Sequence, residues 1–298
     1  MTSLRWNGLG VCVPAVAAIV VAAIGSKRWA DRMAALTRGL EAGRNFRPAK
    51  PSDLNSTTHY DPHELEGLPA PVQRYFRAVL KDGQPIVSAV TIEMAGTINM
   101  SATAEQWKPF TSKQRVVTAV AGSSPGFMWD AKIAMLPGIK VRVVDSYIAG
   151  NGLVQAAMLG LFTVADMGGG GEMARGEFMR FFAETPWYPT ALLPSQGVQW
   201  AAVDGTSANA TIVDGPLTLT LLFHFNDAGL IDSVRAEARG GMVGKEMVTR
   251  PWECSLSNYQ VRDGMTVPMS GEAAWVRPDG LKTYFMGSVK SMAYEFAH

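Results

Sequence analysis

From Val87 onward, apolar and polar side chains alternate with a period of two residues, as in half-buried β-strands. The stretch from Leu217 to Phe223 places Leu217, Leu219, Leu221 and Phe223 on one side. Turn signals break the alternation repeatedly: Asp214-Gly215-Pro216, Asn226-Asp227-Ala228-Gly229, Asp263-Gly264 and Pro278-Asp279-Gly280. Strands joined by such short turns are antiparallel, because a parallel pair needs a longer crossover. We expect about ten or eleven strands between Val87 and Phe296.

Two segments within this region have helical character, Gly152 to Val164 and Glu172 to Glu184. Before it, Pro69-Ala70-Pro71 opens a short amphipathic helix that ends near Gly83. Ser26 to Gly43 also predicts a helix, with apolar residues at three- and four-residue spacing: Trp29, Met33, Leu36 and Leu40. The predicted fold class is mainly β (α+β), a large curved antiparallel meander sheet with a few helices packed on one face.

An uncharged run from Gly8 to Gly25 precedes these elements. As a helix it would span about 27 Å, close to the thickness of the hydrocarbon core, so it predicts an N-terminal transmembrane helix. A cleaved signal peptide is the first alternative and a buried helix the second. The prediction is a single-pass, membrane-anchored protein of the cell envelope. The charges that flank the run leave the side of the membrane open.

Polarity divides the chain into three parts. Residues 1–43 hold the predicted anchor and the helix after it, and residues 67–298 form the β-rich domain. Between them, residues 44–66 are polar and contain Pro48, Pro51 and Pro62, which is typical of a linker.

Composition excludes several classes of protein. Of the 298 residues 47% are hydrophobic and 18% charged, and the formal net charge is +1. The chain therefore folds, and it lacks the basic excess of a dedicated nucleic-acid binder. Two cysteines exclude a disulfide scaffold and a cysteine-based zinc cluster.

Familiar catalytic and cofactor motifs are missing from the sequence. Four glycines at Gly168 to Gly171 precede a helix, but no Lys-Ser/Thr pair follows, so we interpret them as a hinge. His59 and His63 are four residues apart with Pro62 between them, which favours a loop or helix start over a metal site. The sequence predicts neither a metal nor a cofactor.

The helix at Glu172 to Glu184 carries the one arrangement of charges that suggests chemistry. Glu177 and Glu184 are seven residues apart, and Arg180 lies within one turn of both. If these carboxylates are buried, they could act as general acid and base. If they are exposed to solvent, they form ordinary ion pairs along the helix surface. Glu184 precedes the aromatic segment Thr185 to Pro189 and is the candidate catalytic residue, with a structural hydrogen-bonding role as the alternative.

Aromatic residues and methionines gather in the middle of the chain, and the sequence contains 8 Trp and 16 Met. Such side chains fill cores, and they also line pockets for hydrophobic ligands. A curved sheet with helices across one face can enclose such a pocket. The predicted ligand-binding residues are Trp129, Phe178, Arg180, Phe182, Glu184, Trp187 and Tyr188.

Several motifs resemble a bacterial family known only as a domain of unknown function. They are Gly67-Leu68-Pro69-Ala70-Pro71-Val72-Gln73-Arg74-Tyr75-Phe76, Phe127-Met128-Trp129-Asp130-Ala131, Asp145-Ser146-Tyr147-Ile148-Ala149-Gly150-Asn151-Gly152, and Glu184 with Trp187-Tyr188-Pro189-Thr190-Ala191-Leu192-Leu193-Pro194. The resemblance covers Gly67 to Tyr294. It implies a β-rich domain similar to the half-barrel of lipoprotein carriers of the LolA type, and it transfers no catalytic residue.

Three hypotheses for function follow. The first is a membrane-tethered domain, held by Gly8 to Gly25, that binds an apolar or amphiphilic, lipid-like ligand and no nucleic acid. The second is a hydrolase or transferase that uses Glu184 with Arg180 in a cleft. The third is an envelope scaffold, which requires an exposed apolar patch. The sequence identifies neither the ligand nor a reaction nor the oligomeric state.

Overall fold

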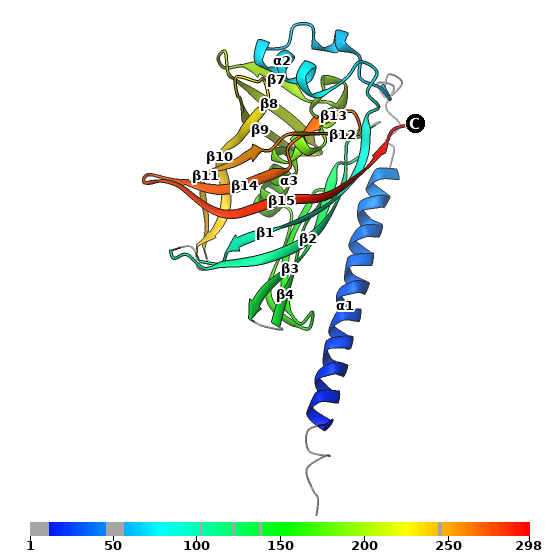
Figure 1. Ribbon diagram of the computed structural model, residues 1–298, viewed down its shortest axis with the longest axis vertical. Helices are drawn as coiled ribbons and strands as arrows, with labels where there is room; N and C mark the ends of the chain where they lie inside the picture. The colour runs from blue at the N-terminus through cyan, green and yellow to red at the C-terminus, as the bar shows by residue number, and fades with distance from the viewer. Residues whose placement is uncertain (1–11, 46–56, 102, 121–122, 137–138, 244–245) are drawn as a thin grey trace, which may run out of the picture.

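The computed structural model describes residues 12–45, 57–101, 103–120, 123–136, 139–243 and 246–298. Its main feature is a sheet of 13 strands that curves around a central helix (Figure 1). The strand order is β6-β5-β4-β3-β2-β1-β15-β14-β11-β10-β9-β8-β7. All neighbouring strands pair antiparallel, which confirms the predicted fold class of a large antiparallel sheet with a few helices.

Two meanders make up this sheet. The first comprises β1 (Val87–Asn99), β2 (Trp107–Val117), β3 (Gly126–Leu136), β4 (Ile139–Ile148), β5 (Asn151–Met158) and β6 (Phe162–Gly169). The second comprises β7 (Gln199–Ala202), β8 (Ser207–Asp214), β9 (Leu217–Phe225), β10 (Ile231–Val243), β11 (Glu246–Ser257), β14 (Ser270–Arg277) and β15 (Gly280–Phe296). The first strand pairs with the last, β1 with β15, and this pairing joins the two meanders into one sheet. A separate hairpin joins β12 (Gln260–Arg262) and β13 (Met265–Val267).

The expected strand number was too low, and the reason is local. The segment Gly152 to Val164, which we expected to be helical, lies in β5 and β6. Its Leu, Ala, Met and Gln residues favour a helix when taken alone. Pairing with β4 overrides that preference, since β4 and β5 are in continuous register from Val141↔Met158 to Ile148↔Asn151.

Helices and short 3-10 turns cover the concave face of the sheet. The central helix is α3 (Gly171–Ala183), followed by the 3-10 turns η4 (Thr185–Trp187), η5 (Pro189–Leu192) and η6 (Pro194–Gln196). At one end lie η2 (Pro62–Leu65) and α2 (Ala70–Val79), which buries Val72, Tyr75 and Phe76. The helix predicted after Pro69 is therefore confirmed, and the largest hydrophobic core lies between these elements and the sheet.

Helix α1 (Cys12–Asn45) lies outside the curved sheet, along β2, β3 and β4 (Figure 1). The predicted stripe of Trp29, Met33, Leu36 and Leu40 packs on outward-facing residues of the sheet, such as Met128 and Val144. The indole Nε1 of Trp29 donates to Asp130 Oδ1 at 2.9 Å. The helix expected over Ser26 to Gly43 is thus confirmed as part of a longer one.

The predicted membrane anchor is not supported, and this corrects our assignment of the chain as a single-pass membrane protein. Among the described residues, no helix is long and apolar enough to cross a membrane. Beyond Ser26, α1 is charged and packs on the sheet. The first part of the predicted span, Gly8 to Val11, lies outside the described residues.

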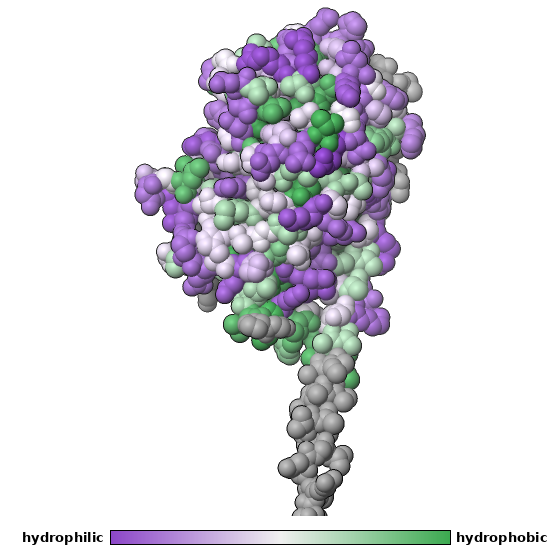
Figure 2. Space-filling view, viewed as in Figure 1, coloured by the Kyte–Doolittle hydropathy of each residue, from purple (hydrophilic) through white to green (hydrophobic). Residues whose placement is uncertain are grey.

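Exposed apolar side chains gather at the hairpin tips, where the sheet meets α1 near Gly25 (Figure 2). Six of them belong to the first meander or its turns: Leu136, Ile139, Met158, Leu159, Phe162 and Val164. We call these residues the apolar tip. Gly25 of α1 meets the tip closely, because a Cβ atom there would lie 2.0 Å from the carbonyl oxygen of Leu159.

Candidate functional site

Helix α3 crosses the concave face of the sheet and contacts both meanders, at β4 and β5 on one side and β9 and β10 on the other. It follows Gly168 to Gly171, where Gly169 and Gly171 adopt positive φ angles of 129° and 61°. Gly168 and Gly169 still pair with β5, so the chain turns sharply from the edge strand into the helix. Most of α3 is buried, including the charged residue Glu177.

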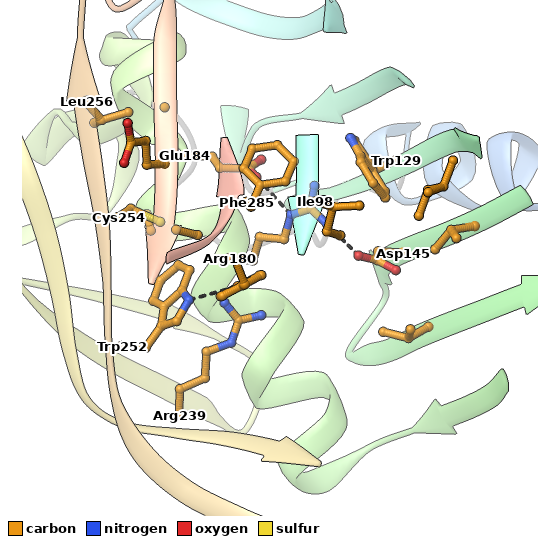
Figure 3. Close-up of a pocket in the computed structure, with 18 of the residues that line it drawn as sticks. Ile98, Trp129, Asp145, Arg180, Glu184, Arg239, Trp252, Cys254, Leu256 and Phe285 are labelled. Carbon is orange, nitrogen blue, oxygen red and sulfur yellow. Dashed lines mark hydrogen bonds and ion pairs between the residues drawn. The ribbon is translucent and has the colours of Figure 1, made fainter. Parts of the chain in front are cut away.

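A cavity of about 310 Å³ lies between α3 and the strands β1, β3, β4, β5, β10, β11, β14 and β15. Its wall is largely apolar and aromatic, which is typical of a site for a small organic ligand. Figure 3 shows that Arg180, Glu184 and Arg239 reach it with Trp129 and Asp145 at one side and Trp252 and Cys254 at the other. The lining consists of Ile98, Met100, Trp129, Ile133, Val143, Asp145, Val154, Ala156, Arg180, Ala183, Glu184, Trp187, Arg239, Trp252, Cys254, Leu256, Gly271, Glu272, Ala273, Tyr284 and Phe285.

Arg180 is held by two carboxylates in the wall of this cavity. Its Nη1 donates to Asp145 Oδ2 at 2.6 Å, and its Nε donates to Glu184 Oε1 at 2.8 Å. The other oxygen of Glu184 accepts a 2.5 Å hydrogen bond from Gln114 Nε2. The guanidinium also lies 4.9 Å from the ring centroid of Trp129, within cation–π range. The paired carboxylates outweigh the effect of burial and raise the pKa of Arg180.

A second arginine, Arg239 on β10, faces the same cavity. Its carboxylate partner lies farther away than the partners of Arg180. Its guanidinium carbon stacks 4.3 Å from the ring centroid of Trp252, and its Nη2 lies 3.8 Å from Glu177 Oε1. Burial, and next the nearby carboxylate of Asp145, raise the pKa of Glu177 to about 7. Arg239 is 8% exposed and its Nη1 has no hydrogen-bond partner among the described residues.

Four polar atoms of the lining residues are buried without a hydrogen-bond partner in the described part of the chain. They are Trp129 Nε1, Asp145 Oδ1, Trp187 Nε1 and Arg239 Nη1. An unpaired buried polar atom costs on the order of 1–3 kcal/mol, so proteins keep few of them without a role. Three of these atoms are donors, which suits a ligand that carries hydrogen-bond acceptors.

The comparison with protein families identifies the chain. A model of a family of unknown function (DUF6920) matches residues 66–294, which is most of the sequence. The chain belongs to this family. The match confirms the family resemblance that the sequence motifs indicated over Gly67 to Tyr294.

Curated proteins and solved structures were also compared with the DUF6920 chain. A search of curated proteins gives no match. Among solved structures, the chain is similar to a LolA superfamily protein from Nitrosomonas europaea, with 11% sequence identity and a TM-score of 0.36. That similarity covers 76% of this chain and 93% of the other.

The structure brings four of the seven predicted ligand-binding residues of this DUF6920 member to the cavity: Trp129, Arg180, Glu184 and Trp187. The other three, Phe178, Phe182 and Tyr188, lie in the packed core and do not line it. Phe178 stacks on Tyr147, with ring centroids 4.8 Å apart, and Phe182 packs on Phe223. Tyr188 donates its hydroxyl to the carbonyl of Phe181 at 2.8 Å, so it fastens the segment after α3 to the helix.

Several lining residues were not predicted from the sequence. One of them, Asp145, could have been recognised from its position. Asp145 lies on β4 in the inward register of Val143 and Tyr147, so a charge at this apolar position could have been recognised. Trp252, Cys254 and Leu256 alternate on β11 and belong to the same cavity wall. Burial raises the pKa of the Cys254 thiol well above its usual range, so the thiol stays protonated.

The described residues contain no cluster of three or more His, Cys, Asp or Glu that could hold a metal ion. His63 instead pairs with Asp61 at 2.7 Å next to η2, in the helix-start setting that Pro62 favoured. Each oxygen of Glu184 accepts one hydrogen bond from a protein donor, and the ion pair with Arg180 gives this carboxylate a structural partner. We therefore put forward no reaction at this residue.

Proposed function

We propose that this protein binds a small apolar or amphiphilic molecule in the cavity between α3 and the sheet. The observation that carries the proposal is the cavity itself, since about 310 Å³ of space is lined by mainly apolar side chains. Packed interiors hold few voids larger than a water molecule. A space of this size beside buried, unpaired donors supports a binding role over simple core packing.

The size of the cavity limits the ligand. Its volume of about 310 Å³ is at the small end of the range of roughly 300–1,000 Å³ that is usual for ligand sites. A single alkyl chain or a small ring system suits such a space better than a two-chain lipid. Trp129 and Trp252 on opposite walls supply broad apolar contacts for it.

Binding of the neutral, apolar fluorescent probe N-phenyl-1-naphthylamine to the full chain tests the proposal. Ala156 is half-buried and lines the cavity, so Ala156→Phe fills part of the space. Ala201→Phe on the exposed strand β7 is the matched control. We expect saturable binding by the unaltered chain and the control, and at least tenfold weaker binding by Ala156→Phe. Equal binding by all three proteins, or none by the unaltered chain, would overturn the proposal.

Cys254 provides a readout that does not depend on a cavity-filling variant. In a Cys12→Ser background it is the remaining cysteine, and it lines the cavity. The protonated thiol reacts slowly with a small neutral thiol reagent, and a bound probe should slow this reaction further by at least severalfold. An unchanged rate at saturating probe would count against binding at this site.

The apolar tip favours a second candidate function, contact with a second copy of this chain. Phe162 and Val164 are 57% and 59% exposed, and exposed apolar groups that gather in one place often mark interaction surfaces. Sedimentation of the full chain over a range of concentrations tests self-association through the tip. Association that Phe162→Ser and Val164→Ser together remove would support it, and a monomer at all concentrations would exclude it.

A further inference from the structure

A second hollow of about 200 Å³ adjoins the cavity and differs from it in charge. It shares Met100 and Tyr284 with the cavity, so the two spaces lie next to each other along the same strands. Its lining consists of Asn99, Met100, Ser101, Gly241, Val248, Arg250, Trp275, Arg277, Lys282 and Tyr284. Three of these residues are cationic, and no Asp or Glu is among the described residues that line it.

Strand register explains why the cations gather. Arg250 on β11 lies opposite Arg239 on β10, and Lys282 on β15 lies opposite Trp275 on β14. Two like charges placed directly opposite each other on adjacent strands are destabilising. The chain as a whole carries a formal net charge of only +1, so this concentration of positive charge is local.

Lys282, Arg239 and Arg250 differ in their carboxylate partners. Lys282 forms an ion pair with the exposed Glu105, and Arg239 Nη2 lies 3.8 Å from Glu177 Oε1 on α3. Arg250 is half-buried, and no carboxylate of the described residues lies within ion-pair distance of it. An anion from outside the protein would relieve the repulsion between Arg239 and Arg250.

Three aromatic residues, Trp252, Trp275 and Tyr284, lie between the cations and the apolar cavity. We call them the aromatic floor. Trp252 lies opposite Trp275 in the β11–β14 register, and Trp275 stacks on Tyr284 with ring centroids 6.0 Å apart. Trp252 Nε1 donates to the Tyr284 hydroxyl at 3.0 Å, which fixes both rings. Along β11 the lining therefore changes from Val248 and Arg250 in the hollow to Trp252, Cys254 and Leu256 in the cavity.

We infer that the ligand is an amphiphile with one apolar chain and an anionic head group, and that the head group binds in the cationic hollow. This inference rests on the proposed function, because the chain of the ligand would occupy the cavity. Arginine pairs well with both carboxylate and phosphate groups through its planar fork of donors. Arg250 is the residue that contacts the head group, and the aromatic floor contacts the part of the chain next to it.

Displacement of bound N-phenyl-1-naphthylamine by three single-chain competitors below their micellar concentrations tests the inference. They are dodecyl phosphate, dodecanoate and the neutral 1-dodecanol. We expect both anions to bind at least tenfold more tightly than the alcohol, and added salt to reduce this preference. A tighter phosphate would identify a phosphate head group, and a tighter carboxylate a fatty-acid head group; both support the inference.

Arg250→Gln is the diagnostic variant, and Lys132→Gln on the exposed outer side of β3 is its control with the same change of charge. Arg250→Gln should reduce the preference for anions at least fivefold and leave the affinity for dodecanol within twofold. If the alcohol binds as tightly as the anions, or if Arg250→Gln does not change the ratio, the head-group inference is wrong while the proposed function stands. If no competitor displaces a probe whose binding Ala156→Phe weakens, the head-group inference is wrong while the proposed function stands; if Ala156→Phe does not weaken that binding either, both fail.

Discussion

Arg180 on α3 and Asp145 on β4 form an ion pair of 2.6 Å inside the cavity wall, where both side chains are less than one-fifth exposed. Glu184 completes the arrangement from the other side of the guanidinium at 2.8 Å. Two carboxylates and one buried arginine fasten the end of α3 to the first meander. The ion pair between Arg180 and Asp145 thus fixes the position of α3, which forms one wall of the cavity.

Replacing Arg180 with methionine should destabilise the protein by about 3–5 kcal/mol, because two carboxylates would stay buried without their partner. Urea unfolding followed by circular dichroism measures this change. Arg175→Met on the same helix is the control, since Arg175 is half-buried and forms no ion pair among the described residues. Adding Asp145→Asn and Glu184→Gln to Arg180→Met should restore part of the loss. A cost below about 1 kcal/mol would mean that the ion pair does not hold the helix.

Glu177 should make stability depend on pH in a way that Glu177→Gln abolishes. The pKa of this buried carboxyl is raised to about 7 in the folded chain, chiefly by burial and then by Asp145. Between about pH 4.5 and 7 the unfolded chain loses this proton while the folded chain keeps it, so the free energy of unfolding falls as pH rises. The unaltered chain should therefore lose stability relative to Glu177→Gln over that window, by at least about 1 kcal/mol.

Urea unfolding of both proteins at pH 4.5, 6 and 7.5 measures this difference. Groups present in both chains cancel, including Glu295, whose pKa the hydrogen bond from Arg115 helps to lower to about 2. The other charges that face Glu177 are Arg180 and Glu184 on α3, Asp145 on β4 and Arg239 on β10. A difference between the two proteins that stays constant with pH would contradict the assigned pKa.

Local sequence pattern predicted much of the fold and part of the site. Period-two alternation and turn residues predicted the antiparallel meanders, and helical spacing predicted α1, α2 and α3. The aromatic segment after Glu184 lies partly at the cavity. Trp187 lines the cavity, whereas the neighbouring Tyr188 turns into the core. One position along the chain separates the two outcomes, and spacing alone did not resolve it.

The rest of the site depends on contacts that spacing cannot reveal. Arg239 reaches the cavity from β10, far along the sequence from α3, and the β10–β11 register shifts between Ala236 and Arg239. A bulge reverses the alternation of inward and outward side chains, so the face of Arg239 could not be read from the sequence. The helix predicted from Gly152 to Val164 was wrong for a related reason, because pairing with β4 decided the conformation of this segment.

Two glycines near α3 should respond to alanine in opposite ways. At Gly152 on β5 a Cβ atom would lie 2.5 Å from the carbonyl oxygen of Met173, so Gly152→Ala forces the helix away from the sheet. We expect a loss of about 1–3 kcal/mol. At Gly176, within α3, a Cβ atom would meet nothing within 4 Å. Gly176→Ala should therefore stabilise the protein by about 0.5–1 kcal/mol. Thermal unfolding of both variants measures the two changes, and a loss at Gly176 would show that α3 packs more tightly there.

Trp29 should hold α1 against the outside of the sheet. It is 2% exposed, its Nε1 donates to Asp130, and Arg142 lies 5.2 Å from its ring centroid. Trp29→Ala removes these contacts, and truncation of a buried tryptophan costs about 3–5 kcal/mol. Because α1 packs on the sheet through a small cluster separate from the main core, we expect the helix to detach while the sheet stays folded.

Limited trypsin digestion should show this detachment as at least tenfold faster cleavage after Lys27, Arg28, Arg32 or Arg38, with the β-sheet signal in circular dichroism unchanged. Ala34→Ser on the exposed side of α1 is the control, and Trp29→Phe should give an intermediate rate because it keeps an aromatic ring. Cleavage of Trp29→Ala at the rate of the unaltered chain would show that Leu40 and its neighbours hold the helix without Trp29.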